Sequence, residues 1–126
     1  MTADGLRQEQ VLVVDDEPMV RDVVVRVLQT LFANVAAAED GEQAIAHLGK
    51  HPVDLLVTDL KMPGKDGIDV VRAAVTRDPR TRIIAVSGFI TGVDEQTLGS
   101  LGAEVLRKPF DVTALLTLVE RVLDRP

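Results

Sequence analysis

The chain lacks several residue types on which common kinds of site depend. It contains no cysteine, tryptophan or tyrosine, and only three phenylalanines among 126 residues. Without cysteine there can be no disulfide, thiolate nucleophile or cysteine-ligated metal centre. The shortage of aromatic rings argues against a platform for stacked bases or sugars. Imidazole comes only from His47 and His51, which we expect to be exposed or lightly packed.

Basic charge and long hydrophobic runs are also scarce. Lys and Arg total 14 against 20 Asp and Glu, a formal net charge of −6, so we expect no direct binding to nucleic acid or to an anionic membrane. No apolar run approaches the ~20 residues that span a bilayer. Residues 1–10 are polar, unlike a signal peptide or membrane anchor. We therefore expect a soluble, cytoplasmic chain with a polar N-terminal segment (1–10) and one domain (11–126).

Short apolar runs alternate with amphipathic stretches along this domain. The predicted strands cover 11–14, 35–38, 53–57, 83–86 and 103–106. All but the fourth are followed by a stretch with apolar residues three and four apart, which is typical of a helix lying on a core. Pro18 suits the first position of the first helix, and Asp111 suits the N-cap of the last. The alternation predicts an α/β domain with a doubly wound parallel sheet and helices on both faces.

The fourth of these helices, over 93–101, is the weakest. Gly99 and Ser100 disfavour helix. Its expected buried side chains are Val93, Leu98 and Leu101.

Polar residues stand at the carboxyl ends of four predicted strands, which is the edge where parallel α/β sheets bind ligands. They are Asp15-Asp16-Glu17, Asp59, Ser87 and Lys108. Clustered carboxylates repel one another, and a hard divalent cation, most naturally Mg²⁺, relieves that repulsion. With a lysine and a hydroxyl beside it, a carboxylate can act as the nucleophile that receives a phosphoryl group.

Four motifs at these strand ends resemble those of a known family. In order, they are Val13-Val14-Asp15-Asp16-Glu17, Asp59-Leu60-Lys61-Met62-Pro63 with Asp66-Gly67, Val86-Ser87-Gly88 and Lys108-Pro109-Phe110. From residue 11 to residue 123 the chain resembles the receiver domain of bacterial two-component response regulators, including the chemotaxis receivers. The resemblance implies a flavodoxin-like fold with five helices and five parallel strands in the order 2-1-3-4-5.

The resemblance also implies a phosphoacceptor and a metal site. Asp59 would accept a phosphoryl group from a histidine of a sensor kinase or of a phosphotransfer protein. Asp15, Asp16, Asp59 and the backbone carbonyl of Lys61 would ligate Mg²⁺. The chain would be a signalling module rather than an enzyme, because it would catalyse only its own phosphorylation and slow dephosphorylation.

The same resemblance assigns the phosphoryl-binding groups and an output surface. Ser87, Gly88 and Lys108 would surround the phosphoryl oxygens, and the Lys108-Pro109 peptide bond would be cis. The face made by the fourth helix, fifth strand and fifth helix would contact a downstream protein, and it is compatible with a homodimer.

One departure from the family concerns the switch. Val105 stands where the family commonly has an aromatic residue. We therefore expect the switch region to comprise Ser87, Phe89 and Val105, with backbone shifts over 88–92 and in the fourth helix replacing movement of an aromatic ring.

Three other functions are alternatives to a receiver. A flavin or nucleotide module would need a phosphate-binding loop after the first strand, where the acidic run 15–17 would repel phosphate. A phosphohydrolase with an aspartate nucleophile typically has a second aspartate at the position of Lys61. The main alternative is a scaffold that binds partners constitutively and is no longer controlled by phosphorylation. It is an alternative because Val105 stands where the family commonly has the aromatic residue of its switch.

Overall fold

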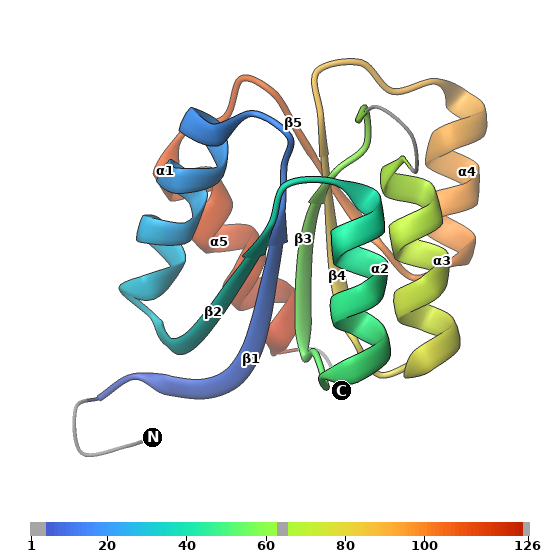
Figure 1. The fold of residues 1–126 in the computed structure, drawn as a ribbon. Helices are drawn as coiled ribbons and strands as arrows, with labels where there is room; N and C mark the ends of the chain where they lie inside the picture. The colour runs from blue at the N-terminus through green and yellow to red at the C-terminus, as the bar shows by residue number, and fades with distance from the viewer. Residues whose placement is uncertain (1–4, 63–65, 125–126) are drawn as a thin grey trace.

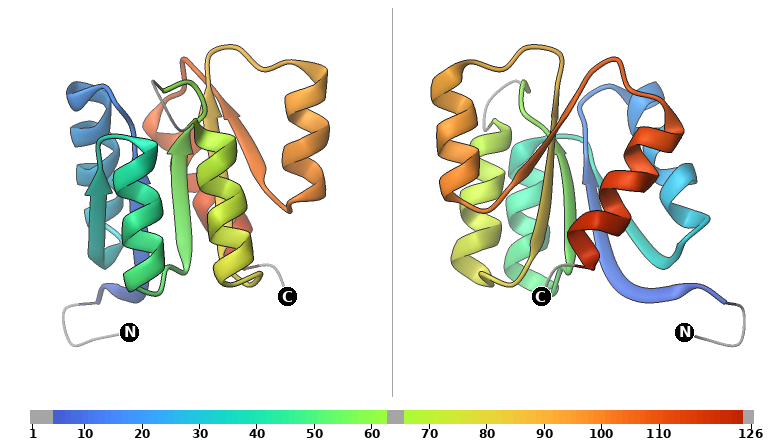
Figure 2. Two further views of the ribbon diagram at one scale, coloured as in Figure 1. Left: turned by 45° about the vertical axis from the view of Figure 1, so that its right-hand side comes forward. Right: turned by 180° about the vertical axis from the view of Figure 1, so that it is seen from behind.

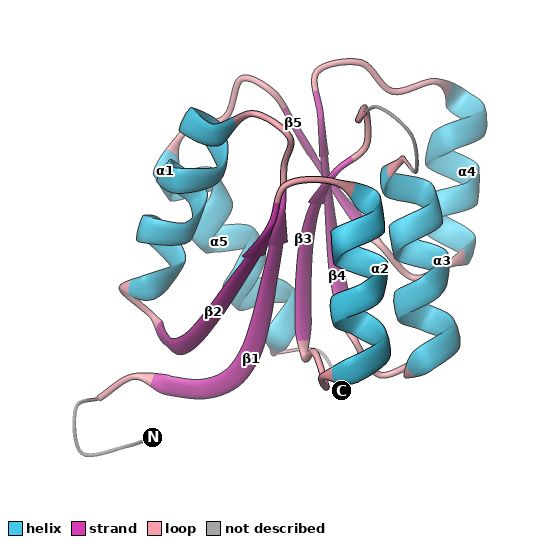
Figure 3. Ribbon diagram, viewed as in Figure 1, coloured by secondary structure: helices cyan, strands magenta, loops and turns pink. Residues whose placement is uncertain are grey.

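The computed structural model describes residues 5–62 and 66–124. Within those ranges, five strands alternate with five helices (Figures 1 and 3). They are β1 (Arg7–Val14), α1 (Pro18–Gln29), β2 (Phe32–Ala38), α2 (Gly41–Lys50), β3 (Leu55–Asp59), α3 (Gly67–Arg77), β4 (Arg82–Ser87), α4 (Gly92–Ser100), β5 (Glu104–Arg107) and α5 (Val112–Leu123). All strand pairs are parallel and the order is β2-β1-β3-β4-β5, which confirms the predicted fold.

The sheet separates two apolar layers. Helices α2, α3 and α4 cover one face, and α1 and α5 cover the other (Figure 2). Successive residues of β1 alternate between the layers: Leu12 and Val14 join the first, Val11 and Val13 the second. Burial on both faces explains why the central strands are nearly continuous apolar runs.

Local sequence signals account for the helix starts. Pro18 occupies the first turn of α1, as predicted. The carboxylates of Asp40, Asp66 and Asp111 accept hydrogen bonds from backbone N–H groups in the first turns of α2, α3 and α5. These caps satisfy donors that a helix start leaves unpaired, and they fix where each helix begins relative to the strand before it.

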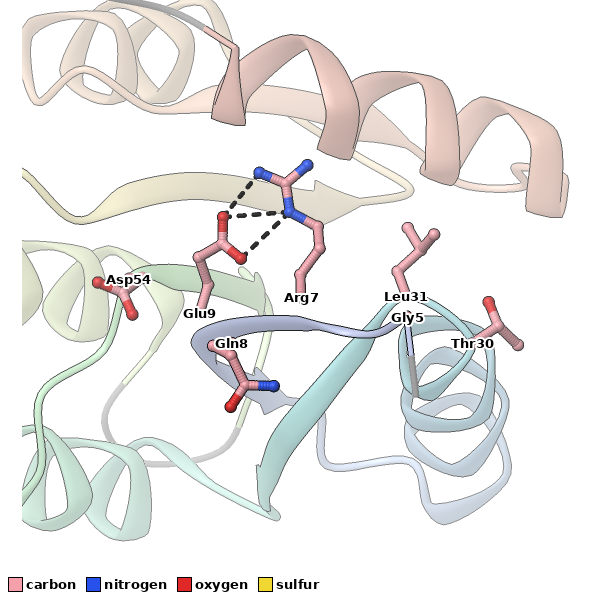
Figure 4. A pocket seen from close by; sticks show the side chains of 7 residues that line it. All are labelled: Gly5, Arg7, Gln8, Glu9, Thr30, Leu31 and Asp54. Atoms are coloured by element: carbon pink, nitrogen blue, oxygen red, sulfur yellow. Dashed lines mark hydrogen bonds and ion pairs between the residues drawn. The ribbon is translucent and has the colours of Figure 1, made fainter. Parts of the chain in front are cut away.

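The first strand is longer than its apolar run. It begins at Arg7 rather than at Val11, so part of the polar N-terminal segment is paired with β2. Backbone pairing does not require apolar side chains at a sheet edge. The Arg7 guanidinium lies 5.9 Å from the centre of the buried Phe32 ring. Arg7 also donates hydrogen bonds to Glu9, and these two residues help to line a surface pocket (Figure 4).

Helix α4 differs from its prediction in one side chain. Leu98 is buried and Leu101 packs against the core, but Val93 is 72% exposed. Val93 belongs to the first turn of α4, and its side chain faces solvent. In the described parts of the chain, no helix has both the length and the apolar character of a membrane span.

Candidate functional site

The site lies at the carboxyl edge of the sheet, at the top in Figure 1. Asp59 is the last residue of β3 and Ser87 the last of β4, while Asp15 and Lys108 follow β1 and β5 directly. The Lys108 N–H donates to the Ser87 carbonyl at 2.9 Å, which extends the pairing of β4 and β5 to the site itself. The regular sheet therefore brings together residues that are far apart in sequence.

Lys108 stands between two buried carboxylates. Its Nζ lies 3.6 Å from Asp15 Oδ2 and 3.7 Å from Asp59 Oδ2. Each aspartate side chain is only 6% exposed. Two buried negative charges share one ammonium, so the site retains an excess of negative charge that a cation would balance.

The protonation of Asp59 reflects that environment. Burial raises the pKa of the Asp59 carboxyl, and the neighbouring charges of Asp15 and Asp16 raise it further, while Lys108 acts in the opposite direction. The Lys61 N–H also donates to Asp59 Oδ1, at 3.4 Å, which lowers the pKa. The net effect is a raised pKa, which means that the folded protein disfavours the ionised form of Asp59. Such shifts are common at reactive sites.

The acidic run after β1 forms a cluster of oxygen donors. One carboxylate oxygen from each of Asp15, Asp16 and Glu17 lies within 4.8 Å of the others. The Glu17 N–H donates to Asp15 Oδ1 at 2.9 Å, which folds the run into this shape. Oxygen donors of this kind suit Mg²⁺. Glu17 was not predicted as a ligand, although its place directly after Asp15-Asp16 was a signal for it.

Ser87 is buried at the same edge, but its hydroxyl is engaged elsewhere. Ser87 Oγ donates to the Phe89 carbonyl at 2.7 Å and accepts from the Phe89 N–H at 3.2 Å. Both bonds are made to the backbone of the β4–α4 loop, and neither involves the Asp59 carboxylate. Gly88, the residue between them, leaves room beside Lys108, since a Cβ built on it would lie 3.8 Å from the Lys108 Cβ.

The two remaining residues of the predicted switch region occupy different surroundings. The Phe89 side chain is 70% exposed and so contributes no ring to the core. Val105, opposite Ala85 in the β4–β5 pairing, is half-buried against the apolar layer beneath α4.

Lys61 connects the site to α4. Its Nζ lies 3.6 Å from Asp94 Oδ2, in the first turn of that helix. No local pattern predicts this pair, because Lys61 and Asp94 come from segments far apart in the sequence. Pro63, part of the same motif as Lys61, lies outside the described residues.

Gly67, the first residue of α3, sits directly against the backbone of β3. A Cβ there would come within 2.2 Å of the Asp59 carbonyl oxygen and 2.6 Å of the Leu60 Cα. The Gly67 N–H donates to the Leu60 carbonyl at 3.0 Å. Only glycine allows α3 to start this close to Asp59, a role that the motif Asp66-Gly67 did not by itself reveal.

A mostly apolar groove opens beside Lys108. It has a volume of about 520 Å³ and is lined by Met19, Val20, Val23, Val24, Lys108, Pro109 and Phe110. Met19 and Val23 are 83% and 56% exposed on α1. The Lys108-Pro109 peptide bond is cis, as the resemblance implied. The groove places exposed apolar surface at the rim of the charged site.

Comparison with known proteins agrees with this geometry. Residues 11–120 match the sequence profile of the response regulator receiver domain. The chain is 34% identical over 121 residues to the chemotaxis protein CheY of Pseudomonas aeruginosa, across 92% of this chain and 97% of that protein. Several other relatives are longer regulators, of whose length the chain spans from 24% to 48%.

Solved structures show the same fold. The chemotaxis protein CheY4 of Vibrio cholerae superposes with a TM-score of 0.83 at 30% identity, across 92% of this chain and 99% of that one. The receiver domain of the sensor histidine kinase PA1611 of Pseudomonas aeruginosa, solved with a magnesium ion coordinated in its active-site cleft, has a TM-score of 0.81. It covers 94% of this chain and 100% of its own, but at 24% identity the likeness concerns the fold alone.

Proposed function

The chain belongs to the response regulator receiver family, and from that premise we propose that it is a phosphorylation-switched receiver in which Asp59 accepts the phosphoryl group. Members of the family are signalling modules of two-component systems rather than enzymes in the usual sense. The observation that carries the proposal for this chain is Lys108 Nζ, 3.6 Å and 3.7 Å from the buried carboxylates of Asp15 and Asp59.

The proposed reaction is an in-line phosphoryl transfer from a phosphohistidine of a sensor kinase or a histidine phosphotransfer protein. An Asp59 carboxylate oxygen forms a bond to phosphorus while the phosphorus–nitrogen bond breaks, and the electron pair returns to the imidazole nitrogen. Lys108 is near enough to Asp59 to exchange its contact with the carboxylate for one with a phosphoryl oxygen. Such transfers depend mainly on positioning and on electrostatic stabilisation of the phosphoryl oxygens.

The proposed metal is Mg²⁺, held by Asp15, Asp16, Asp59 and the backbone carbonyl of Lys61. The donor chemistry fits, because the acidic cluster offers hard oxygen ligands and the site has more negative than positive charge. When bound, Mg²⁺ would supply positive charge to the phosphoryl oxygens. Glu17 adds a further carboxylate at the exposed side of the cluster.

The proposed switch begins at Ser87. A hydroxyl has one proton to donate, and here that proton goes to the Phe89 carbonyl. A phosphoryl group on Asp59 would compete for it, so that binding the phosphoryl oxygen releases the 88–92 loop at the start of α4. The α4–β5–α5 face would then present a changed surface to a downstream protein or to a second copy of the chain.

The groove beside Lys108 supports a protein as phosphodonor. A donor must place its imidazole at Asp59, so its surface must also cover the rim of the site. Met19 and Val23 provide apolar contact area there that a small-molecule donor would not need.

The proposal is tested by intact-mass measurement after incubation with acetyl phosphate and Mg²⁺. We expect a gain of one phosphoryl group, lost in Asp59→Asn and in EDTA. Asp22→Asn, an exposed aspartate on α1, is the matched control and should be phosphorylated normally. Phosphorylation that persists in Asp59→Asn, or fails in the wild type, would contradict the proposal. Partner binding unchanged by Asp59→Asn would instead favour the constitutive scaffold.

A further inference from the structure

The two histidines of the chain meet at the end of α2. His47 lies in the last turn and His51 is the C-cap residue. Their ring centres are 4.7 Å apart, with the ring planes tilted by 38°. Although the His51 backbone is extended, its N–H donates to the His47 carbonyl at 2.9 Å. This bond continues the helical turn by one residue and so fixes His51 four residues after His47 on the same side of the helix.

Two imidazoles in this arrangement can act as a chelate. Histidines at positions i and i+4 of a helix present their nitrogens to one ion, and imidazole suits Zn²⁺, Ni²⁺ and Cu²⁺ better than Mg²⁺. We propose that His47 and His51 form a binding site for a divalent transition-metal cation of this class. The inference is independent of the proposed receiver function, because α2 runs back from the carboxyl edge and its last turn lies at the opposite end of the sheet from Asp59 (Figure 1).

The surroundings of the pair are suited to such a ligand. His51 is exposed and His47 half-buried, so an ion can approach from solvent while one ligand is held by packing. Burial and the proximity of His51 lower the pKa of His47, which favours the neutral form that binds metals. Among the described residues, the one cluster with three or more potential ligand side chains is Asp15-Asp16-Glu17. The histidine site therefore offers two protein ligands, and water or another chain completes the coordination.

The test is a calorimetric titration of the whole chain with Ni²⁺ in the presence of excess Mg²⁺. Mg²⁺ occupies oxygen ligands and competes poorly for imidazole, so it masks the acidic cluster but not the histidine pair. We expect one Ni²⁺ bound per chain, with NMR shifts of both imidazoles. Removing one ligand with His51→Gln, an exposed substitution, should weaken binding by about tenfold or more.

A relocated histidine provides the matched control. In the double variant His51→Gln/Gly49→His, the chain still has two histidines, but residues two apart on a helix do not face each other. A Cβ at Gly49 meets no atom within 4 Å, so the substitution should be tolerated, as circular dichroism would verify. Weak binding in this variant supports the paired geometry. Three results would overturn the inference: no Ni²⁺ binding to the wild type, full affinity in His51→Gln, or affinity restored by Gly49→His.

Discussion

Helices α3 and α4 lie side by side on one face of the sheet, but they are held in different ways (Figure 2). Four residues of α3 are buried, its N-cap Asp66 forms a reciprocal capping box with Asp69, and Gly67 abuts Asp59. In α4 only Leu98 is buried. Its other side-chain attachments include the ion pairs of Asp94 with Lys61 and of Glu95 with Arg107.

The difference indicates where a change of charge at Asp59 can be transmitted. Apolar burial does not depend on the charge of a neighbouring carboxylate, so α3 should keep its position after phosphorylation. Ion pairs and the Ser87–Phe89 hydrogen bonds do respond to new charge, and they restrain α4 and the loop before it. We therefore expect α4 to be the element that moves.

The largest difference between the two helices should appear when one methyl group is added to a glycine of each. Gly67→Ala forces a Cβ to within 2.2 Å of the Asp59 carbonyl oxygen, so we expect a loss of about 3 kcal/mol or more of unfolding free energy. Gly99→Ala in α4 meets nothing within 4 Å and should instead stabilise by about 0.5–1 kcal/mol through helix propensity. Urea unfolding measures the stability of both variants. A similar change in the two would contradict the inference that α3 is packed more tightly than α4.

A second pair of variants compares side-chain burial. Val71→Ala in α3 creates a cavity at a fully buried position and should cost about 2 kcal/mol. Val93→Ala in α4 removes a side chain that is 72% exposed and should change stability by less than about 0.5 kcal/mol. Thermal and urea unfolding provide the measurement. A large cost for Val93→Ala would mean that α4 packs more tightly than the structure shows.

The charge on Asp59 should make the protein less stable as the pH rises. Burial raises the folded-state pKa of Asp59 above its ordinary value of 3.8, so between these two values the folded state binds more protons than the unfolded state. Unfolding free energy therefore falls as the pH rises through that window, and the deficit persists above it. Without Mg²⁺, Asp59→Asn should be more stable than the wild type at pH 7.

Urea unfolding of the wild type and Asp59→Asn as a function of pH tests this sign. The difference between the two proteins should shrink as the pH falls through the window above 3.8 and be largely lost below 3.8, while Asp22→Asn should show no such trend. If Asp59→Asn were the less stable protein at pH 7, Lys108 would outweigh the effect of burial.

The smallest effect on stability should come from the link between Lys61 and α4. The Lys61 side chain is well exposed and the pair is 3.6 Å apart, so Asp94→Asn should change unfolding free energy by less than about 0.5 kcal/mol. It should nevertheless speed amide hydrogen exchange in α4 and leave α3 unchanged. Glu42→Gln, an exposed acidic residue of α2, is the control. Equal acceleration of exchange in α3 and α4 would contradict the inference that the ion pair of Lys61 with Asp94 restrains α4 in particular.

Much of this architecture was predictable from local patterns. The apolar runs, the proline at the start of α1 and the aspartate caps specify the elements with little help from the rest of the chain. The identity of the site residues at the carboxyl edge followed from the same alternation. The pattern did not reveal the true start of β1, because backbone pairing with β2 recruits polar residues from Arg7 onward.

Long-range placement explains what the sequence could not indicate. The ion pair of Lys61 with Asp94 and the groove beside Lys108 depend on distances between segments that no spacing rule relates. The histidines are exposed or half-buried, as expected from the sequence, and the structure adds that their rings lie 4.7 Å apart.

By itself, the sequence determined the alternation of strands and helices and the chemical character of the carboxyl edge, since both depend on short-range periodicity and on residue type. Only the tertiary structure decided which charges share one ammonium, where the Ser87 hydroxyl donates its proton and how differently α3 and α4 are held. These properties depend on ångström-scale distances between segments far apart in the chain, and such distances are set by packing of the whole domain.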